Sequence, residues 1–293
     1  MPLPATLLAF ASILMWSFLG FLGARLNHLP PFLVIGLALC FSGLIGSVSV
    51  RQWKVPLTTL LVGIGGIFGY HFLYFSAFHF APAVEANLMN YLWPLLIVLL
   101  TPLFLAGYNL HPNHLVGAFL GLAGAGLIIT GGRLSLDMAN LAGYLLAASA
   151  ALVWACYSLM TKRLPPFPTA AVGAFCLASG LLSLGAYSLS NGNSNQAALS
   201  SNDWLALVLL GAGPMGGAFF TWDAALKRGD PRIIGSLTYL TPLTSTLILI
   251  LVGGQSLTRV SAVAMLLIIT GAVVGSLDLW HGRLSNQKSL EET

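Results

Sequence analysis

Two short segments place polar and aromatic residues around a proline inside long apolar runs. Residues 90–95 read Asn-Tyr-Leu-Trp-Pro-Leu, and residues 238–243, in the second half of the chain, read Thr-Tyr-Leu-Thr-Pro-Leu. Proline cannot donate the helical hydrogen bond to the carbonyl four residues earlier. We therefore expect the carbonyls of Asn90 and Thr238 to be unpaired and to accept hydrogen bonds from a small ligand. Unpaired backbone groups at membrane depth are tolerated where protein or a water-filled cavity covers them.

A polar stripe accompanies the first of these segments. Asn87, Tyr91 and Pro94 recur at helical spacing, and Asn90 lies beside them. Amide side chains donate and accept hydrogen bonds, and aromatic faces stack on rings or hold cations. Paired interrupted helices in two halves of a chain are typical of a substrate site near the middle of the membrane. Pro94 and Pro242 are expected to act as hinges, whether or not their neighbours bind a ligand.

The composition predicts that long apolar helices position these residues. Hydrophobic residues make up 57% of the 293 positions and charged residues only 7%, whereas a soluble domain has roughly 25% charged residues. A spanning helix needs about 20 mostly apolar residues. The sequence thus predicts an all-α integral membrane protein with ten transmembrane helices and no soluble catalytic domain. The spans are expected at residues 5–25, 31–50, 57–78, 82–105, 113–132, 141–161, 167–189, 203–226, 231–252 and 258–279.

The distribution of cations predicts the orientation of these spans. With both termini in the cytoplasm, the cytoplasmic connections and the tail contain Arg51, Lys54, Lys162, Arg163, Lys227, Arg228, Arg232, Arg283 and Lys288. Only Arg25, Arg133 and Arg259 then face outward. This asymmetry fits the positive-inside rule. The net charge of +4 is therefore explained by topology, and no clustered basic patch indicates binding to nucleic acid.

The two halves of the chain resemble one another beyond the proline segments. Residues 16–26 (WSFLGFLGARL) align with 154–164 (WACYSLMTKRL), and the glycines of residues 63–69 align with those of 211–217. Any single match could arise by chance in apolar sequence, but several occur in the same order. We interpret residues 1–135 and 136–282 as two five-helix repeats, followed by a short polar cytoplasmic tail at 283–293. Because five is odd, the second repeat is expected to be inverted.

These features together resemble the EamA-type branch of the drug/metabolite transporter superfamily, over nearly the full length. Within it, the Asn-Tyr-Leu-Trp-Pro segment at residues 90–94 is similar to that of the YddG-type aromatic amino-acid exporters. The resemblance implies a multi-pass bacterial inner-membrane exporter that moves phenylalanine, tyrosine and tryptophan, and aromatic cations as a further class, through a central cavity by alternating access. Export of other amino acids or organic cations, and a channel-like facilitator, are the alternatives. Membrane lipid is the other expected partner, and the oligomeric state is left open.

An aromatic amino acid presents an ammonium, a carboxylate and a ring, so its cavity needs carbonyl or amide acceptors, donors and flat apolar walls. The competing interpretation places tryptophan and tyrosine at the membrane interface, where both are enriched. Trp222 is a further aromatic candidate. The residues expected to line the cavity are Trp16, Tyr74, Asn87, Asn90, Tyr91, Trp93, Trp154, Tyr157, Thr238 and Tyr239.

Titratable residues inside the predicted spans are candidates for gating or proton coupling. Glu85 follows a predicted helix start, where an anion is favourable, and cation recognition or proton coupling is its other interpretation. His71 and His79 fall within and at the end of the third span; each titrates near neutral pH or serves as a structural hydrogen-bonding residue. Asp223 and Lys227 are spaced for an ion pair on one helix.

Other chemistry finds little support in the sequence. Cys40, Cys156 and Cys176 lie singly in apolar spans, and His111 and His114 lack further ligands for a metal. The chain contains no zinc-protease motif, nucleophile elbow or phosphate-binding loop. We therefore expect neither an enzyme nor a protein with a metal or cofactor. A sensor or scaffold is disfavoured because the chain has no sizeable soluble part.

Overall fold

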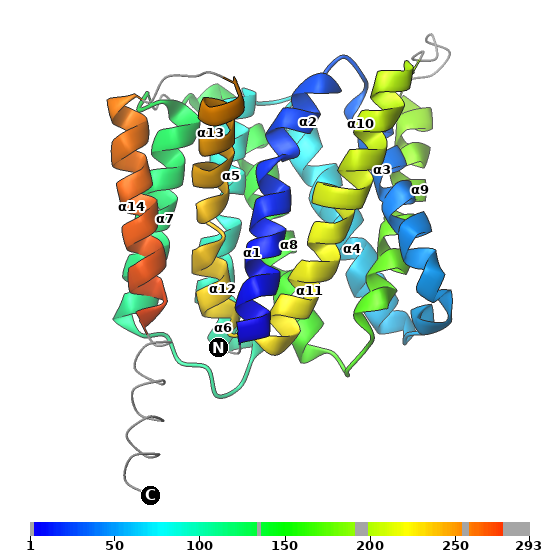
Figure 1. Ribbon diagram of the computed structural model, residues 1–293, viewed down its shortest axis with the longest axis horizontal. Coiled ribbons are helices and arrows are strands. Elements are labelled where there is room, and N and C mark those ends of the chain that lie inside the picture. Colours follow the sequence, from blue (N-terminus) through cyan, green and yellow to red (C-terminus); the bar gives the residue numbers. More distant parts are fainter. Residues whose placement is uncertain (1–2, 134–135, 191–198, 254–257, 278–293) are drawn as a thin grey trace, which may run out of the picture.

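The computed structural model describes residues 3–133, 136–190, 199–253 and 258–277, and every regular element within them is helical (Figure 1). The predicted tail at 283–293 and the last residues of the second predicted repeat lie outside the described residues. The first half contains α1 (Leu3–Ser17), α2 (Leu19–Arg25), α3 (Pro31–Gly46), η1 (Ser47–Trp53), α4 (Leu57–Ala77), α5 (Ala83–Asn90), α6 (Trp93–Phe104) and α7 (Pro112–Thr130).

The second half also contains an interrupted pair of helices around its proline segment, α12 and α13. It contains η2 (Met138–Asn140), α8 (Leu141–Arg163), η3 (Thr169–Ala171), α9 (Val172–Ser190), α10 (Ser201–Ala212), η4 (Gly213–Gly217), α11 (Ala218–Arg228), α12 (Pro231–Leu237), α13 (Leu240–Gly253) and α14 (Arg259–Gly275).

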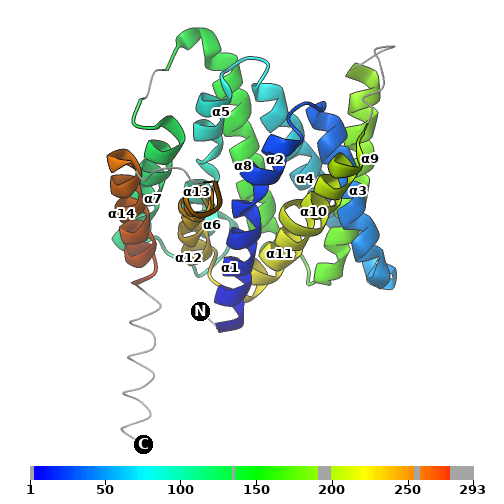
Figure 2. The same cartoon turned by 45° about the horizontal axis from the view of Figure 1, so that its top comes forward.

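The helices form a bundle whose outer pairs come from different halves of the chain. α7 packs along α14 at one edge, and α3 packs along α9 at the opposite edge (Figures 1 and 2). α1, α4, α6, α8 and α11 lie between these pairs; α8 contacts α4, α6 and α11, and α11 contacts α1. Residues on the central helices therefore meet in the middle of the bundle, whichever half they come from.

Eight stretches of the described residues are long and apolar enough to cross a membrane. They begin with Pro4–Arg25 and end with Ser201–Arg228, and they match the first eight predicted spans within a few residues. The ninth predicted span corresponds to α12 and α13, and the tenth to α14, which has 17 residues. The multi-pass, all-helical prediction is thus supported for eight spans, and the last two remain a prediction.

Both proline segments interrupt their helices. α5 ends at Asn90 and α6 begins at Trp93, while α12 ends at Leu237 and α13 begins at Leu240. The expectation that the Thr238 carbonyl is unpaired is wrong, because it accepts a hydrogen bond from the backbone N–H of Thr241, at 3.0 Å. A tight turn lets the residue before the proline donate the bond that the proline cannot.

Two further helix irregularities were not predicted from the sequence. α1 and α2 are separate helices, because the chain departs from a continuous helix around Phe18. A π-helical segment, η4, separates α10 from α11 and contains Pro214. Proline removes a backbone donor, and π-helical turns often occur at functional sites. Both irregularities bring residues of these helices to the central cavity described below.

Glycines allow a close approach between α7 and α14. A Cβ atom added at Gly117 would lie 2.5 Å from the Cα atom of Gly275, closer than real Cβ contacts. A small-residue face lets two helix backbones approach in this way. Gly121, also on α7, makes room for the ring of Tyr239, which lies in the break between α12 and α13.

Candidate substrate cavity

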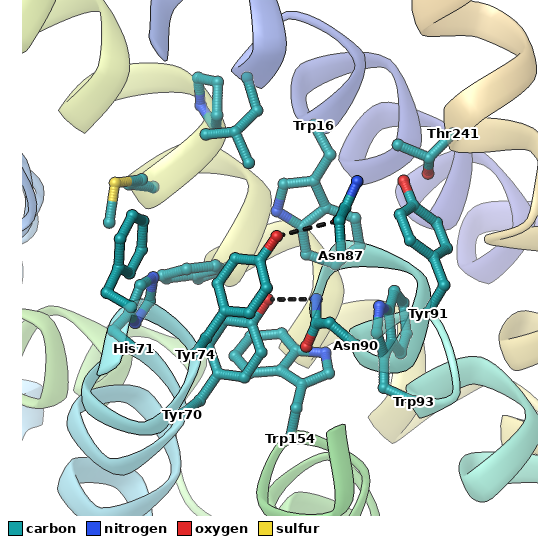
Figure 3. Close-up of a pocket in the computed structure, with 15 residues that line it drawn as sticks. Trp16, Tyr70, His71, Tyr74, Asn87, Asn90, Tyr91, Trp93, Trp154 and Thr241 are labelled. Carbon is teal, nitrogen blue, oxygen red and sulfur yellow. Dashed lines mark hydrogen bonds between the residues drawn. The ribbon is translucent and has the colours of Figure 1, made fainter. Parts of the chain in front are cut away.

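A cavity lies at the centre of the bundle, next to the first proline break. It contains about 830 Å³ that no protein atom occupies, including the part open to solvent. Its walls come from both halves of the chain, which fits a site between two repeats. The described residues that line it are Trp16, Leu19, Tyr70, His71, Tyr74, Phe75, Asn87, Asn90, Tyr91, Trp93, Trp154, Pro214, Met215, Phe219 and Thr241 (Figure 3).

Tryptophan rings form one wall of the cavity. The ring centroid of Trp16 lies 5.9 Å from that of Trp93 and 6.2 Å from that of Trp154, and both pairs meet edge to face. Trp222 lies 5.2 Å from Trp16 but is only 1% exposed and does not line the cavity. Its indole N–H donates to Ser158 Oγ at 3.0 Å. The cluster provides aromatic edges and faces for a planar ligand.

Two tyrosine–asparagine pairs form the polar wall. Tyr74 Oη donates to Asn87 Oδ1 at 2.9 Å, and Asn90 Nδ2 donates to Tyr70 Oη at 3.1 Å (Figure 3). The Asn87 amide nitrogen points away from Tyr74. Asn90 Oδ1 is buried and has no hydrogen-bond partner among the described residues. A buried unpaired acceptor is costly, so Asn90 Oδ1 is a candidate acceptor for a donor on a ligand.

His71 adds an acceptor to the same cavity. Its Nδ1 lies 2.7 Å from the backbone carbonyl of Ile67, and a carbonyl oxygen only accepts. Nδ1 must therefore carry the proton, which leaves Nε2 of the neutral ring as an acceptor. The ring lies among those of Tyr70, Phe75 and Phe219. His71 is thus a polar group on an otherwise aromatic part of the wall.

The described lining contains no aspartate, glutamate, lysine or arginine. A ligand with a net charge would leave water without gaining a counter-ion from these side chains, and this desolvation is unfavourable. A zwitterion carries no net charge, and neutral donors and acceptors bind its two ends. The cavity therefore suits a neutral or zwitterionic molecule with an aromatic ring.

Seven of the ten residues predicted to line the cavity do so, and Tyr157, Thr238 and Tyr239 do not. Tyr157 is 4% exposed and packs on Trp154, with ring centroids 5.4 Å apart. Thr238 is fully buried and its hydroxyl donates to the Gly235 carbonyl at 2.6 Å. These two residues pack helices against one another.

Tyr239 stabilises the helix break that forms the cavity. Its hydroxyl accepts from the backbone N–H of Leu95 at 3.1 Å and donates to the carbonyl of Tyr91 at 3.3 Å. The first N–H groups of a helix lack partners within the helix, and Leu95 is the third residue of α6. The second half of the chain thus caps a helix of the first half. Tyr91, which aligns with Tyr239 in sequence, lines the cavity instead.

Among the residues predicted to act in gating or coupling, only His71 lines the cavity. Glu85 lies in the first turn of α5, where it accepts from Asn140 Nδ2 at 3.2 Å and from the Tyr144 hydroxyl. These bonds join α5 to the start of α8. His79 is exposed in the turn after α4. Neither Glu85 nor His79 lines the cavity, and a role for either residue in proton coupling remains a prediction.

Several lining residues were missed from the sequence. Tyr70 lies one helical turn before Tyr74, and their rings stack with centroids 5.8 Å apart, so the helical spacing alone could have indicated it. Met215 and Phe219 reach the cavity through η4 and the start of α11. The sequence pattern could not have revealed Met215 and Phe219, because their positions look like those of an ordinary apolar helix.

Comparison with known proteins identifies the class of protein to which this fold and cavity belong. The chain belongs to the EamA-like transporter family, which matches residues 3–130 and again residues 141–277. It is a multi-pass membrane transporter and not an enzyme. The double match agrees with the internal similarity seen in the sequence.

Particular relatives are similar over most of the chain. The aromatic amino acid exporter YddG of Ancylobacter novellus is 40% identical over 282 residues, covering 93% of this chain and 97% of that protein. A probable amino-acid metabolite efflux pump of Salmonella typhimurium is 25% identical and covers 91% of this chain and 93% of its own length. A solved crystal structure superimposes with a TM-score of 0.87 at 40% identity, covering 93% of this chain and 96% of the other.

Proposed function

We propose that this protein exports aromatic amino acids across the bacterial inner membrane through its central cavity. The observation that carries the proposal is a cavity with a tryptophan wall and a wall of uncharged donors and acceptors, in which Asn90 Oδ1 is buried without a partner among the described residues. The similarity to an aromatic amino acid exporter supports the same cargo.

Three chemical groups of the cargo bind different residues of the cavity. Its ammonium donates to Asn90 Oδ1, and its carboxylate accepts from the Asn87 amide and the Tyr70 hydroxyl, whose own protons no described hydrogen bond uses. Its ring packs against Trp16 and Trp154. Organic cations are the weaker candidates, since the described lining offers them no carboxylate.

The same groups distinguish among aromatic side chains. His71 Nε2 is an acceptor, so it favours an indole N–H or a phenol O–H over the bare ring of phenylalanine. A site that bonds a donor on its substrate discriminates against the analogue that lacks it. We therefore expect His71→Phe to weaken the preference for tryptophan over phenylalanine, while the phenylalanine flux changes little.

The proposed architecture has ten spans in two inverted five-helix repeats, residues 1–135 and 136–282, with both termini in the cytoplasm. α1 and α8, the first long helices of the two matched segments, run in opposite directions through the bundle, which supports inversion (Figure 2). An inverted pair of repeats permits alternating access, in which one repeat rocks against the other around a fixed site.

A contact between the repeats supports closure at the end of the molecule where the N-terminus lies. Tyr108, in the connection after α6, has Lys162 Nζ 5.5 Å from its ring centroid and the Arg232 guanidinium 5.2 Å from it. Arg232 also donates to the carbonyl of Asn109. Cations over an aromatic face are attracted to it. This arrangement holds that end closed, while the lining of the cavity includes Leu19 of α2 and Asn87 of α5.

Flux measurements in proteoliposomes test this function. Labelled phenylalanine and threonine are supplied with and without an imposed pH gradient, and unlabelled tryptophan competes. Saturable phenylalanine flux that exceeds threonine flux and is inhibited by tryptophan is the expected result. A channel would give flux that does not saturate, and equal flux of both amino acids would contradict aromatic selectivity. The response to the pH gradient separates proton coupling from facilitated diffusion.

A further inference from the structure

A second hollow lies on the outside of the bundle, between α2 and α10. It is separate from the central cavity, with which it shares no described lining residue. Its polar end is formed by Arg25 from the end of α2, and by Asn202 and Asp203 from the first turn of α10. Its apolar end is formed by Phe21, Leu205 and Leu209, among others. The polar groups at one end and the apolar groups at the other match the polar headgroup and the apolar acyl chains of a phospholipid.

The positive side of the polar end is Arg25. The side chain is exposed, and its guanidinium lies 4.9 Å from the ring centroid of Phe21. Within the described part of the chain, Arg25 has no hydrogen bond or ion pair. A guanidinium matches the geometry of a phosphate and binds it through two parallel hydrogen bonds. Arg25 is therefore available to a phosphate that arrives from the membrane.

The negative side of the polar end is Asp203. Its Oδ2 accepts from the backbone N–H and the hydroxyl of Ser200, at 2.9 Å and 2.7 Å. Its Oδ1 lies 3.4 Å from His28 Nε2. A carboxylate has about four lone-pair positions, so these three contacts leave capacity for one more donor. The start of α10 thus holds the carboxylate in place at the wall of the hollow, where Asp203 is 7% exposed and retains one acceptor position that these contacts do not use.

The apolar end of the hollow exposes leucine side chains. Leu205 is 60% exposed and Leu209 is 49% exposed, and they lie one turn apart on α10, roughly 6 Å along its axis. Trp204, which directly follows Asp203, is 42% exposed. Exposed tryptophans are enriched at the membrane–water interface. This pattern fits a polar end at the level of the lipid headgroups, with the leucines beside the acyl chains.

We propose that this hollow binds a phosphatidylethanolamine molecule of the surrounding leaflet. The phosphate contacts Arg25, the ammonium donates to Asp203, and an acyl chain lies along Leu205 and Leu209. A headgroup of purely negative charge, such as phosphatidylglycerol, faces the Asp203 carboxylate with no ammonium to offset the repulsion. Paired opposite charges at one site thus select a zwitterionic lipid.

A lipid at this position contacts a helix that also forms the cargo cavity. Phe21 and Arg25 of α2 line the hollow, whereas Leu19 of the same helix lines the cavity. α2 has only seven residues and is separate from α1. A bound headgroup therefore orders a short element next to the cargo site, and lipid composition is expected to affect its position.

Lipid binding to the delipidated full-length protein in detergent tests the proposal. Short-chain phosphatidylethanolamine and phosphatidylglycerol are titrated while bound lipid is counted by native mass spectrometry. We expect the former to bind about tenfold more tightly. Arg25→Gln is expected to reduce its affinity about tenfold, which corresponds to loss of one charged hydrogen-bonding contact. Arg133→Gln removes another exposed arginine, and is expected to leave the affinity unchanged.

Two further variants separate the charges from the fold. Arg25→Lys keeps the positive charge and should retain most of the affinity. Asp203→Asn should weaken phosphatidylethanolamine and strengthen phosphatidylglycerol, bringing their affinities together. Equal affinity in Arg25→Gln and Arg133→Gln would overturn the site. So would equal binding of both lipids to the unmodified protein, which indicates a phosphate site without selectivity. Displacement of the lipid by free phenylalanine would also overturn it, in favour of a second amino-acid site.

Discussion

Removing the hydroxyl of Tyr239 tests how the break between α5 and α6 is stabilised. In Tyr239→Phe, the Leu95 N–H and the Tyr91 carbonyl both lose the partner that the hydroxyl provides, at 3.1 Å and 3.3 Å. The ring itself stays, so the packing against Gly121 is unchanged. A buried polar group without a partner costs about 1–3 kcal/mol. Two such groups predict a loss of about 2 kcal/mol or more in the free energy of unfolding.

The expected loss is measurable as a change in melting temperature. For a large domain, 1 kcal/mol corresponds to about 2–4 °C, so Tyr239→Phe should lower the melting temperature of the purified, ligand-free protein by about 4 °C or more. Fluorescence-detected unfolding in one detergent at fixed protein concentration is the assay. Hydrogen exchange should also increase at the backbone N–H of Leu95, because its hydrogen bond is lost.

Tyr91→Phe is the matched control. Tyr91 occupies the aligned position in the first half, but its hydroxyl has no hydrogen bond among the described residues and the side chain lines the cavity. The same chemical change there should leave the melting temperature within about 1 °C, since no buried group loses a partner. Equal losses of stability in the two variants would refute this role of the Tyr239 hydroxyl in capping α6. So would a melting temperature of Tyr239→Phe equal to that of the unmodified protein.

Three further predictions concern packing, cargo and movement. Gly117→Ala should lower the melting temperature, since the added Cβ would lie 2.5 Å from a backbone atom of α14. Gly65→Ala should not, because nothing lies within 4 Å of its added Cβ. Equal losses in melting temperature would contradict the packing argument. Trp16→Ala should reduce phenylalanine flux more than threonine flux in proteoliposomes, and equal reductions would assign Trp16 to helix packing. Replacing Pro94 and Pro242 together by alanine should slow turnover more than it weakens binding, measured as flux and as equilibrium ligand binding. Unchanged turnover in the double variant would rule out the two prolines as hinges.

The helical spans and their interruptions could be predicted from the sequence because they depend on local chemistry. A run of about 20 apolar residues forms a helix in lipid, where each backbone group needs a partner within its own segment. Proline removes one donor wherever it occurs, so the breaks at residues 90–93 and 237–240 were predictable. The hydrogen bonding at the break was not predictable. The Thr238 carbonyl accepts from the N–H of Thr241, and this bond depends on the conformation of the turn.

The tertiary structure determined which side chains line the cavity and which are buried. Tyr91 and Tyr239 occupy aligned positions in the two proline segments, yet one lines the cavity and the other is fully buried. The difference arises because Gly121 of α7 leaves room for the ring of Tyr239, and the unpaired N–H of Leu95 meets its hydroxyl. The sequence by itself therefore determined which residues are helical, polar or aromatic. Only the packing of the two halves determined which of them face a ligand, since that depends on space and partners supplied by residues far away along the chain.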